Sequence, residues 1–121
     1  MPIFTALVVE DDPDIRTIFT TALRAAGYQV ESARDGRVAL ARLNTSRPDL
    51  IVLDVHLPGE VQGGTILSRV RSDPQLTQTR VILATADART AEMYQSAADL
   101  VLVKPVSFVQ LRDLAKRLQM A

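Results

Sequence analysis

The chain contains no cysteine and only one histidine, His56, among its 121 residues. A disulfide and a thiol nucleophile are therefore excluded, and a zinc site of the usual Cys/His type lacks its ligands. No apolar run reaches the roughly 18 residues that a membrane-spanning helix needs. The N-terminus also lacks a basic segment followed by a cleavable apolar one. These absences favour a cytoplasmic protein with no membrane partner.

An excess of charge of either sign is missing too, because 14 acidic residues balance 14 basic ones. Such a balance gives no general attraction to nucleic acid, and we expect no direct nucleic-acid partner. The length suits one domain that can bury a core without disulfides or structural metal. Because no repeat, linker or low-complexity tract interrupts the chain, we predict a single domain over residues 1–121.

Five apolar, strand-like runs alternate with five helix-like segments. The runs cover residues 4–9, 28–33, 50–53, 81–84 and 100–103. Such alternation predicts a parallel sheet with helices on both faces. The second run alternates only in part, as an edge strand does, whereas the other four indicate buried strands. This pattern matches the flavodoxin-like fold, a doubly wound (βα)5 three-layer α/β sandwich with the parallel sheet order 2-1-3-4-5.

Local signals predict several boundaries between these elements. Asp12 precedes a proline at the start of the first helix, as an N-cap residue does. Ser107 and Gln110 have the spacing of a capping box for the last helix. The alanine-rich residues 88–98 are predicted to form the fourth helix, and residues 55–64 a loop.

Reactive side chains stand where four of the apolar runs end. Glu10 and Asp11 follow the first run, Asp54 the third, Thr85 the fourth and Lys104 the fifth. The carboxyl ends of parallel strands form the edge at which ligands bind, so we expect these side chains to converge. Taken singly, each has a simpler explanation: a surface lysine, a threonine that caps a helix or favours a strand, or a solvated loop acid. Their joint occurrence at four strand ends favours a functional site.

Three carboxylates at one sheet edge, those of Glu10, Asp11 and Asp54, need a proton or a cation among them. Two unit charges about 4 Å apart repel by roughly 4 kcal/mol at an effective dielectric constant near 20. Mg²⁺ is the cation that best suits such a site, because it prefers oxygen ligands and usually binds one or two carboxylates together with water. Asp12 is set apart from this group, because N-capping before Pro13 explains it fully.

A carboxylate held beside Mg²⁺ can attack phosphorus and form an acyl phosphate. Such a step depends on positioning and charge neutralisation more than on covalent assistance. The ammonium of Lys104 would neutralise phosphoryl oxygens together with Mg²⁺, and Thr85 would donate a hydroxyl hydrogen bond to one of them. The arrangement therefore indicates a site that can form an acyl phosphate on a carboxylate.

Five motifs spread over the chain are specific when taken together. They are Leu7-Val8-Val9-Glu10-Asp11-Asp12-Pro13, Asp35-Gly36, the segment from Pro48 to Gly59, Ala84-Thr85-Ala86 and Val103-Lys104-Pro105. With these motifs the chain resembles the receiver domain of bacterial two-component response regulators over essentially its whole length. The resemblance implies that Asp54 accepts a phosphoryl group from a histidine kinase or a histidine phosphotransfer protein. It also implies that Glu10, Asp11 and Asp54 bind Mg²⁺, with the main-chain carbonyl of His56 completing the shell.

The same resemblance implies roles for residues around the phosphoacceptor. Thr85 and Lys104 would contact the phosphoryl group, and the bond between Lys104 and Pro105 is similar to one that is cis in the family. His56 and Asp87 lie at the two positions that tune hydrolysis of the acyl phosphate. Either could instead be a plain surface residue, with Asp87 capping the fourth helix.

The chain departs from the family pattern at the position that usually carries a switching aromatic ring. Val101 stands there, three residues before Lys104, and Leu100 replaces a glycine that is common before it. The loop after Pro58 is altered as well. Without a ring at Val101, switching would have to use shifts of the Thr85 loop and of the fourth helix.

The leading interpretation is a phosphorylatable switch that catalyses only its own phosphorylation and dephosphorylation and docks to a downstream target protein. We expect a monomer or a weak dimer through the fourth helix, fifth strand and fifth helix. It would be a stand-alone regulator or part of a longer chain. A haloacid-dehalogenase-type phosphohydrolase is disfavoured, because no acid lies two residues after Asp54. A degenerate receiver that binds proteins without phosphorylation is favoured by Val101, but the five intact site residues oppose it.

Overall fold

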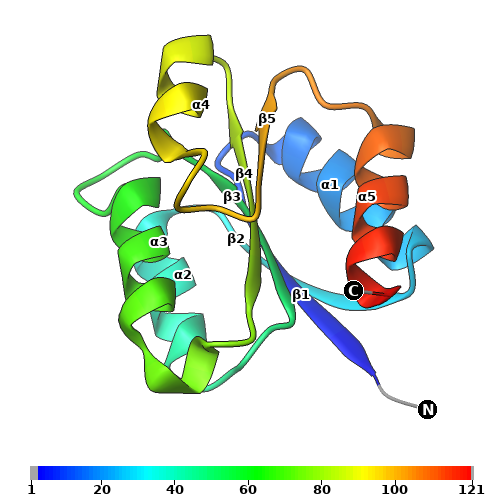
Figure 1. Ribbon diagram of the computed structural model, residues 1–121, viewed down its shortest axis with the longest axis horizontal. Coiled ribbons are helices and arrows are strands. Elements are labelled where there is room, and N and C mark those ends of the chain that lie inside the picture. Colours follow the sequence, from blue (N-terminus) through cyan, green and yellow to red (C-terminus); the bar gives the residue numbers. More distant parts are fainter. Residues whose placement is uncertain (1–2, 121) are drawn as a thin grey trace.

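The computed structural model describes residues 3–120, and a five-stranded sheet lies there between two layers of helices (Figure 1). In chain order the elements are β1 (Phe4–Val9), α1 (Pro13–Ala25), β2 (Tyr28–Ala33), α2 (Gly36–Leu43), β3 (Leu50–Asp54), α3 (Gly63–Ser72), the 3-10 helix η1 (Pro74–Leu76), β4 (Arg80–Thr85), α4 (Ala88–Tyr94), β5 (Leu100–Val103) and α5 (Phe108–Met120). All neighbouring strands are parallel, in the order β2-β1-β3-β4-β5. The predicted fold class and sheet order are confirmed. Within the described residues, no helix has the length and apolar character needed to cross a membrane.

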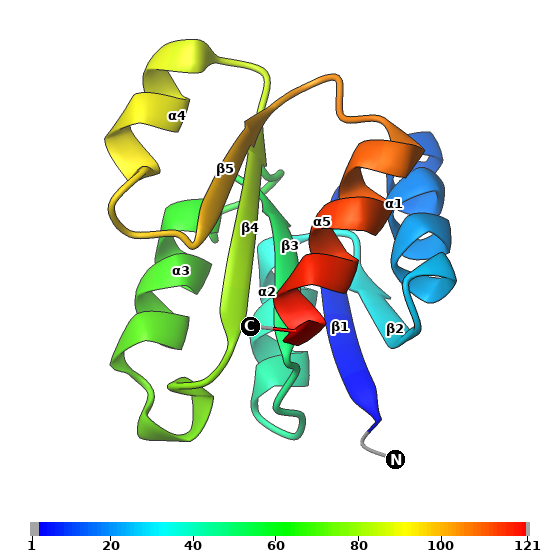
Figure 2. The same cartoon turned by 45° about the vertical axis from the view of Figure 1, so that its right-hand side comes forward.

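Two hydrophobic cores lie on opposite faces of the sheet, because successive strand residues point to opposite sides. Helices α2, α3 and α4 cover one face, and α1 and α5 cover the other (Figures 1 and 2). In β1, Leu7 and Val9 belong to the core beside α2 and α3. Ala6 and Val8 belong to the core beside α1 and α5. The central strand β3 is buried along its whole length, so Asp54 stands at the end of a firmly packed strand.

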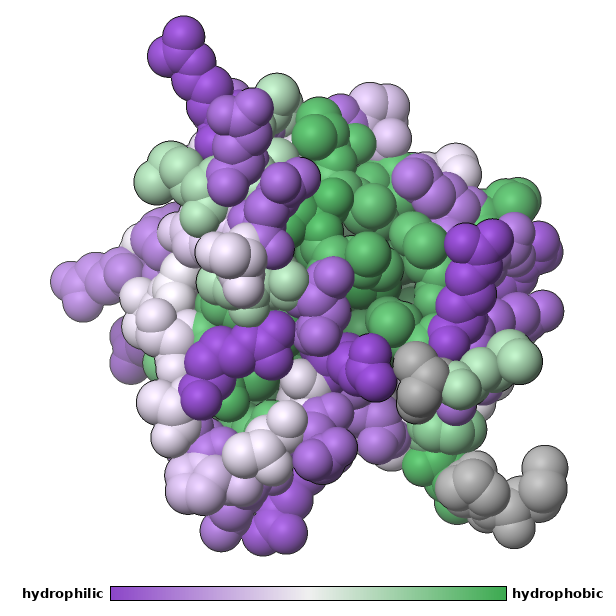
Figure 3. Space-filling view, viewed as in Figure 1, coloured by the Kyte–Doolittle hydropathy of each residue, from purple (hydrophilic) through white to green (hydrophobic). Residues whose placement is uncertain are grey.

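The prediction that the fifth strand is buried was wrong. Strand β5 is the second edge of the sheet, and Val103 is 47% exposed. Helix α5 packs mainly against α1, which leaves Leu100 and Leu102 only partly covered. Figure 3 shows the result as a broad apolar surface between β5 and α5. An unbroken apolar run cannot by itself distinguish a central strand from a partly exposed edge strand.

Two predicted boundaries also differ from the structure. Helix α4 ends at Tyr94 and not at residue 98, because the N–H groups of Gln95 and Ala97 bond to carbonyls only three residues back, those of Glu92 and Tyr94, and so form turns. Its seven residues bury only Ala91, so little packing energy favours a longer helix. Helix α3 begins at Gly63, inside the predicted loop. At the last helix the expected cap is present, with the Gln110 N–H donating to Ser107 Oγ at 3.0 Å.

Replacing Tyr28 with phenylalanine tests a buried contact that ties β2 to α5. The Tyr28 hydroxyl donates to the Ala115 carbonyl at 2.7 Å, and burial raises the pKa of Tyr28 to about 12. Losing this hydrogen bond is expected to lower the free energy of unfolding by about 1 kcal/mol at neutral pH. Because the folded-state pKa lies above the ordinary value of 10, this stabilisation is complete below pH 10 and is lost as pH rises towards 12.

The measurement is urea unfolding followed by far-ultraviolet circular dichroism across that alkaline range. The wild type should lose more stability than Tyr28→Phe on going from pH 10 to 12, so that the two curves converge. Curves that stay parallel would show that the Tyr28 hydroxyl does not couple to folding.

Candidate functional site

The carboxyl ends of β1, β3, β4 and β5 meet at one edge of the sheet, at the top of Figure 1. There the structure brings together carboxylate oxygens of Glu10, Asp11 and Asp54, all within 4.8 Å of one another. Glu10 is 1% exposed and Asp54 is 7% exposed, whereas Asp11 faces solvent. The acidic cluster expected from the strand ends is therefore present, with two of its three members in a poorly solvated position.

Lys104 lies between the two buried acids. Its ammonium Nζ is 2.6 Å from Glu10 Oε1 and 3.0 Å from Asp54 Oδ2. Burial raises the pKa of Glu10 to about 7, although hydrogen bonds from Lys104 and from the Asp12 N–H oppose the rise. Burial would lower the pKa of Lys104, but its hydrogen bonds to Glu10 and Asp54 outweigh that effect and raise it. The raised pKa of Lys104 thus follows from its position between two acids, whereas the raised pKa of Glu10 follows from burial, which the lysine opposes only in part.

The segment that carries the acid pair is held from the first turns of α1. The guanidinium of Arg16 donates to the main-chain carbonyls of Glu10 at 2.9 Å and Asp11 at 3.2 Å. Asp12 is turned away, since its Oδ1 accepts the N–H groups of Asp14 and Ile15. The expected capping role of Asp12 is confirmed. The bracing by Arg16 was not predicted, and its position six residues after Glu10, one turn into a helix, was the available signal.

Thr85 is completely buried at the end of β4, the strand that neighbours β3. Its Oγ accepts the N–H of Asp87 at 3.1 Å, and its carbonyl accepts the N–H of Lys104 at 2.7 Å. The Asp87 carboxylate is turned towards its own helix, where it accepts from the Arg89 N–H at 3.0 Å and the Thr90 hydroxyl at 3.0 Å. Thr85 and Lys104 are thus linked through the main chain, and Asp87 caps α4.

His56 lies two residues beyond the phosphoacceptor candidate, in the loop between β3 and α3. Its main-chain N–H donates to Asp54 Oδ1 at 3.0 Å, and its side chain is exposed. The ring lines an open hollow of about 450 Å³ that also contacts Gly64 of α3 and Tyr94 of α4. On the other side of the site, the peptide bond between Lys104 and Pro105 is cis.

Gly63 stands where the backbone behind Asp54 leaves no room for a side chain. A Cβ on Gly63 would lie 2.5 Å from the Asp54 carbonyl oxygen and 2.7 Å from Val55 Cα. The Gly63 N–H also donates to the Val55 carbonyl at 3.0 Å. Close packing of α3 on the end of β3 therefore fixes the main chain of Asp54. The sequence offered only a Gly63-Gly64 pair as a signal, and its role was not predicted.

Val101 occupies the position where the resemblance leads one to expect an aromatic ring. Its partly buried side chain packs against the core on the α3 and α4 side of the sheet. Tyr94 from α4 packs against the same core. An aromatic side chain thus packs against this core from α4 and not from β5.

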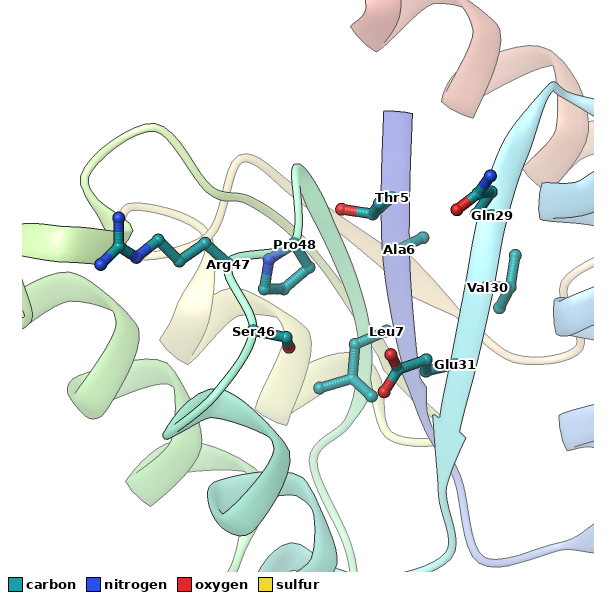
Figure 4. Close-up of a pocket in the computed structure, with 9 residues that line it drawn as sticks. All are labelled: Thr5, Ala6, Leu7, Gln29, Val30, Glu31, Ser46, Arg47 and Pro48. Carbon is teal, nitrogen blue, oxygen red and sulfur yellow. The ribbon is translucent and has the colours of Figure 1, made fainter. Parts of the chain in front are cut away.

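A separate hollow of about 360 Å³ opens near the amino ends of β1 and β3 (Figure 4). Thr5, Glu31 and Arg47 are among the residues that line it. Glu31 is already paired with Arg42 at 2.8 Å, and Arg47 donates to Gln75 at 3.1 Å. This hollow is distinct from the acidic site, because none of the acidic-site residues lines it.

The residues at the acidic edge fit a magnesium ion. Mg²⁺ prefers hard oxygen ligands, and Glu10, Asp11 and Asp54 present three carboxylates close together. Lys104 supplies one positive charge against three negative ones, so a divalent cation would relieve the remaining repulsion. The chemistry of these oxygen donors therefore suits Mg²⁺ better than a softer metal.

Comparison with known proteins agrees with this geometry. A family model described as the response regulator receiver domain matches residues 6–116. The transcriptional regulatory protein AfsQ1 of Streptomyces coelicolor is 42% identical over 103 residues, which cover 83% of this chain and 44% of AfsQ1. The DNA-binding regulator RpaA of Synechocystis is 37% identical over 102 residues, which cover 82% of this chain and 42% of RpaA. The chain spans about half the length of the curated relatives it matches.

Solved structures with the same fold include chemotaxis proteins. The chemotaxis response regulator CheY4 of Vibrio cholerae superposes with a TM-score of 0.85 at 31% identity, covering 97% of this chain and 99% of CheY4. The response regulator TrrA of Thermotoga maritima, solved in complex with Mg²⁺ and beryllium fluoride, gives a TM-score of 0.83 at 30% identity, covering 96% of this chain and 99% of that one. Because the matched region runs from β1 into α5 and includes every residue of the acidic site, the chain belongs to the response regulator receiver domain family.

Proposed function

We propose that this chain is a phosphorylation-controlled switch in a two-component phosphorelay and that Asp54 accepts the phosphoryl group. The observation that carries the proposal is the position of Lys104 between Asp54 and Glu10, with Asp11 beside them. A lysine that already bonds to the nucleophilic carboxylate is well placed to bind the phosphoryl oxygens after transfer. The donor would be a histidine kinase or a histidine phosphotransfer protein.

In the proposed transfer, an oxygen of Asp54 forms a bond to phosphorus while the bond from phosphorus to the donor imidazole nitrogen breaks. The electron pair of the broken bond stays on that nitrogen. Asp54 is already oriented, since His56 N–H donates to Oδ1 and Lys104 to Oδ2. Thr85 Oγ accepts the Asp87 N–H, which leaves its hydroxyl hydrogen to be donated to the transferred group.

Mg²⁺, when bound, would neutralise the phosphoryl oxygens and hold them in line with Asp54. Glu10, Asp11 and Asp54 would bind it through carboxylate oxygens, and His56 through its main-chain carbonyl. These assignments are supported by the convergence of the three carboxylates and by the exposure of Asp11 at the open side of the site.

The proposed output is a change in a protein-docking surface, and we propose no catalysis beyond the chain's own phosphorylation and dephosphorylation. The surface formed by α4, β5 and α5 is the candidate for a target protein or a weak dimer, because the exposed edge of β5 is apolar there (Figure 3). A single receiver domain over residues 1–121 in the cytoplasm, with balanced charge, would not itself contact nucleic acid.

Intact mass measurement after incubation with Mg²⁺ and acetyl phosphate tests the proposal, with Asp54→Asn as the control. A stable adduct of one phosphate in the wild type, absent from Asp54→Asn, is the expected result. Rapid repeated turnover of acetyl phosphate would point instead to a phosphohydrolase. Neither adduct nor turnover would point to a phosphorylation-independent binding module.

His56→Ala is expected to shorten the lifetime of phosphorylated Asp54 several-fold. The exposed imidazole lies two residues beyond Asp54, where it can screen the phosphoryl group from water. The decay of the adduct is followed by intact mass after the donor is removed, with Asp87→Ala compared in parallel because that carboxylate faces α4. A decay rate equal to that of the wild type would remove His56 from any role in hydrolysis.

A further inference from the structure

Gln62 ends the loop between β3 and α3, and its side chain is used in an unusual way. It is the N-cap residue of α3, yet its side chain makes no capping hydrogen bond. The primary amide instead folds back over the loop. Its Oε1 accepts the Leu57 N–H at 3.1 Å, and its Nε2 donates to the carbonyls of Leu57 at 2.7 Å and Gly59 at 2.8 Å. The exposed side chain of Gln62 thus makes three hydrogen bonds to the loop in place of a helix-capping hydrogen bond.

One of these bonds fixes the direction of the His56 carbonyl. The His56 C=O and the Leu57 N–H belong to the same peptide unit, which is planar and, in its trans form, points them in opposite directions. Because Gln62 Oε1 holds the N–H, the carbonyl is directed away from Gln62. The preceding peptide unit is held as well, since the His56 N–H donates to Asp54 Oδ1 at 3.0 Å.

The rest of the loop is held in place by packing and by a main-chain hydrogen bond. The Leu57 side chain is 5% exposed and belongs to the core beside α2 and α3. The Gly63 N–H donates to the Val55 carbonyl at 3.0 Å, which closes the loop at its other end. These contacts keep the loop in place. The His56–Leu57 peptide unit therefore cannot rotate without breaking its hydrogen bond to Gln62, because the loop does not move along with it.

We infer that Gln62 is a positioning residue for magnesium, which sets the orientation of the His56 carbonyl before the ion arrives. The inference rests on the proposed function, because the carbonyl acts as a ligand only if Mg²⁺ binds at Asp54. Partners that orient a metal ligand typically change metal affinity by 10–100-fold when they are removed. Because the Gln62 amide bonds to Leu57 and Gly59 of the loop, its removal should change the affinity for Mg²⁺ and leave the transfer step intact.

Isothermal titration with Mg²⁺ in the absence of a phosphodonor tests the inference on Gln62→Met, which keeps the side-chain length and removes all three bonds. The dissociation constant is expected to rise on the order of tenfold. Gln78→Met, at an exposed glutamine near the opposite end of the sheet, is the matched control and should bind as the wild type does. With acetyl phosphate as donor, Gln62→Met should need more Mg²⁺ but reach the wild-type phosphorylation rate at saturation.

A purely structural role for Gln62 predicts a different result, namely lower stability in urea with unchanged Mg²⁺ affinity. A folded Gln62→Met with wild-type affinity would therefore overturn the inference, and Gln62→Ala repeats the measurement with a smaller side chain. Failure of both variants to fold would overturn it as well, because the residue would then be needed for folding. A wild type that neither binds Mg²⁺ nor forms the adduct would instead refute the proposed function.

Discussion

Gly63→Ala is expected to lower the free energy of unfolding by roughly 1–3 kcal/mol, or more, and to slow phosphorylation of Asp54. The new Cβ would lie 2.5 Å from the Asp54 carbonyl oxygen and 2.9 Å from that of Val55, so backbone and not a flexible side chain would have to move. Moving α3 outwards separates it from the buried strand β3, and moving β3 displaces Asp54, the proposed phosphoacceptor. Both consequences follow from one contact, which is why stability and phosphorylation should fall together.

Gly64→Ala is the matched control for this prediction. A Cβ on Gly64 would approach the Tyr94 hydroxyl to 2.7 Å, which is the far end of a side chain that can rotate away. Alanine also favours a helix over glycine by about 1 kcal/mol, which offsets part of the cost. Urea unfolding and the rate of adduct formation with acetyl phosphate are measured for both variants. Equal stability and equal rates in the two would show that the close packing of Gly63 is unimportant.

The fold could be predicted from the sequence because its decisive features are local. Alternation of strand and helix, caps at Asp12 and Ser107, and the apolar run before Asp54 each follow from nearby residues, and the sheet order followed from matching them to a known topology. The partial exposure of β5 was missed, although the predicted sheet order already makes it an edge strand. Leu100 to Val103 have the composition of a central strand, and their exposure depends on α5 packing against α1.

The site shows the same division between what is local and what is not. Strand ends placed Glu10, Asp54, Thr85 and Lys104 at one edge, because the carboxyl ends of parallel strands must meet. Lys104 pairs with Glu10, which is 94 positions away in the chain, and with Asp54, which is 50 positions away. No local sequence pattern around these residues specifies the distances between their charged groups. The amide of Gln62 was also beyond prediction, since a residue before a helix normally caps it.

Lys104→Met is expected to destabilise the protein in the absence of divalent metal by on the order of 3 kcal/mol, because removing one partner leaves buried charges uncompensated. Glu10 and Asp54 are 1% and 7% exposed, and each is bonded to the Lys104 ammonium. The cost should be smaller than for a fully enclosed pair, because Glu10 can take up a proton. Its pKa is already raised to about 7 by burial, and loss of the lysine removes an interaction that lowers it.

The sign of the pH dependence follows from that raised pKa. A carboxyl whose pKa is higher in the folded state than its ordinary 4.5 penalises folding only when the pH is high enough to ionise it. The difference in stability between the wild type and Lys104→Met should therefore be small below about pH 7, where Glu10 holds its proton in both folded proteins, and grow as the pH rises above 7. A difference that shrinks with rising pH would contradict this account.

Magnesium should restore much of the stability that Lys104→Met loses. A ligand that binds only the folded state stabilises it in proportion to the logarithm of its concentration relative to the dissociation constant. Without the competing ammonium, Glu10 and Asp54 should bind the cation more tightly, so Mg²⁺ should raise the urea midpoint of Lys104→Met more than that of the wild type.

Lys116→Met, at the only other lysine and exposed on α5, is the control and should behave as the wild type does with and without Mg²⁺. If Lys104→Met and Lys116→Met unfold alike in a metal chelator, the ion pairs of Lys104 do not stabilise the site. A Lys104→Met protein that is stable with Mg²⁺ and yet phosphorylated slowly would separate the ion pairing of the lysine with the two acids from its proposed role in binding the phosphoryl oxygens.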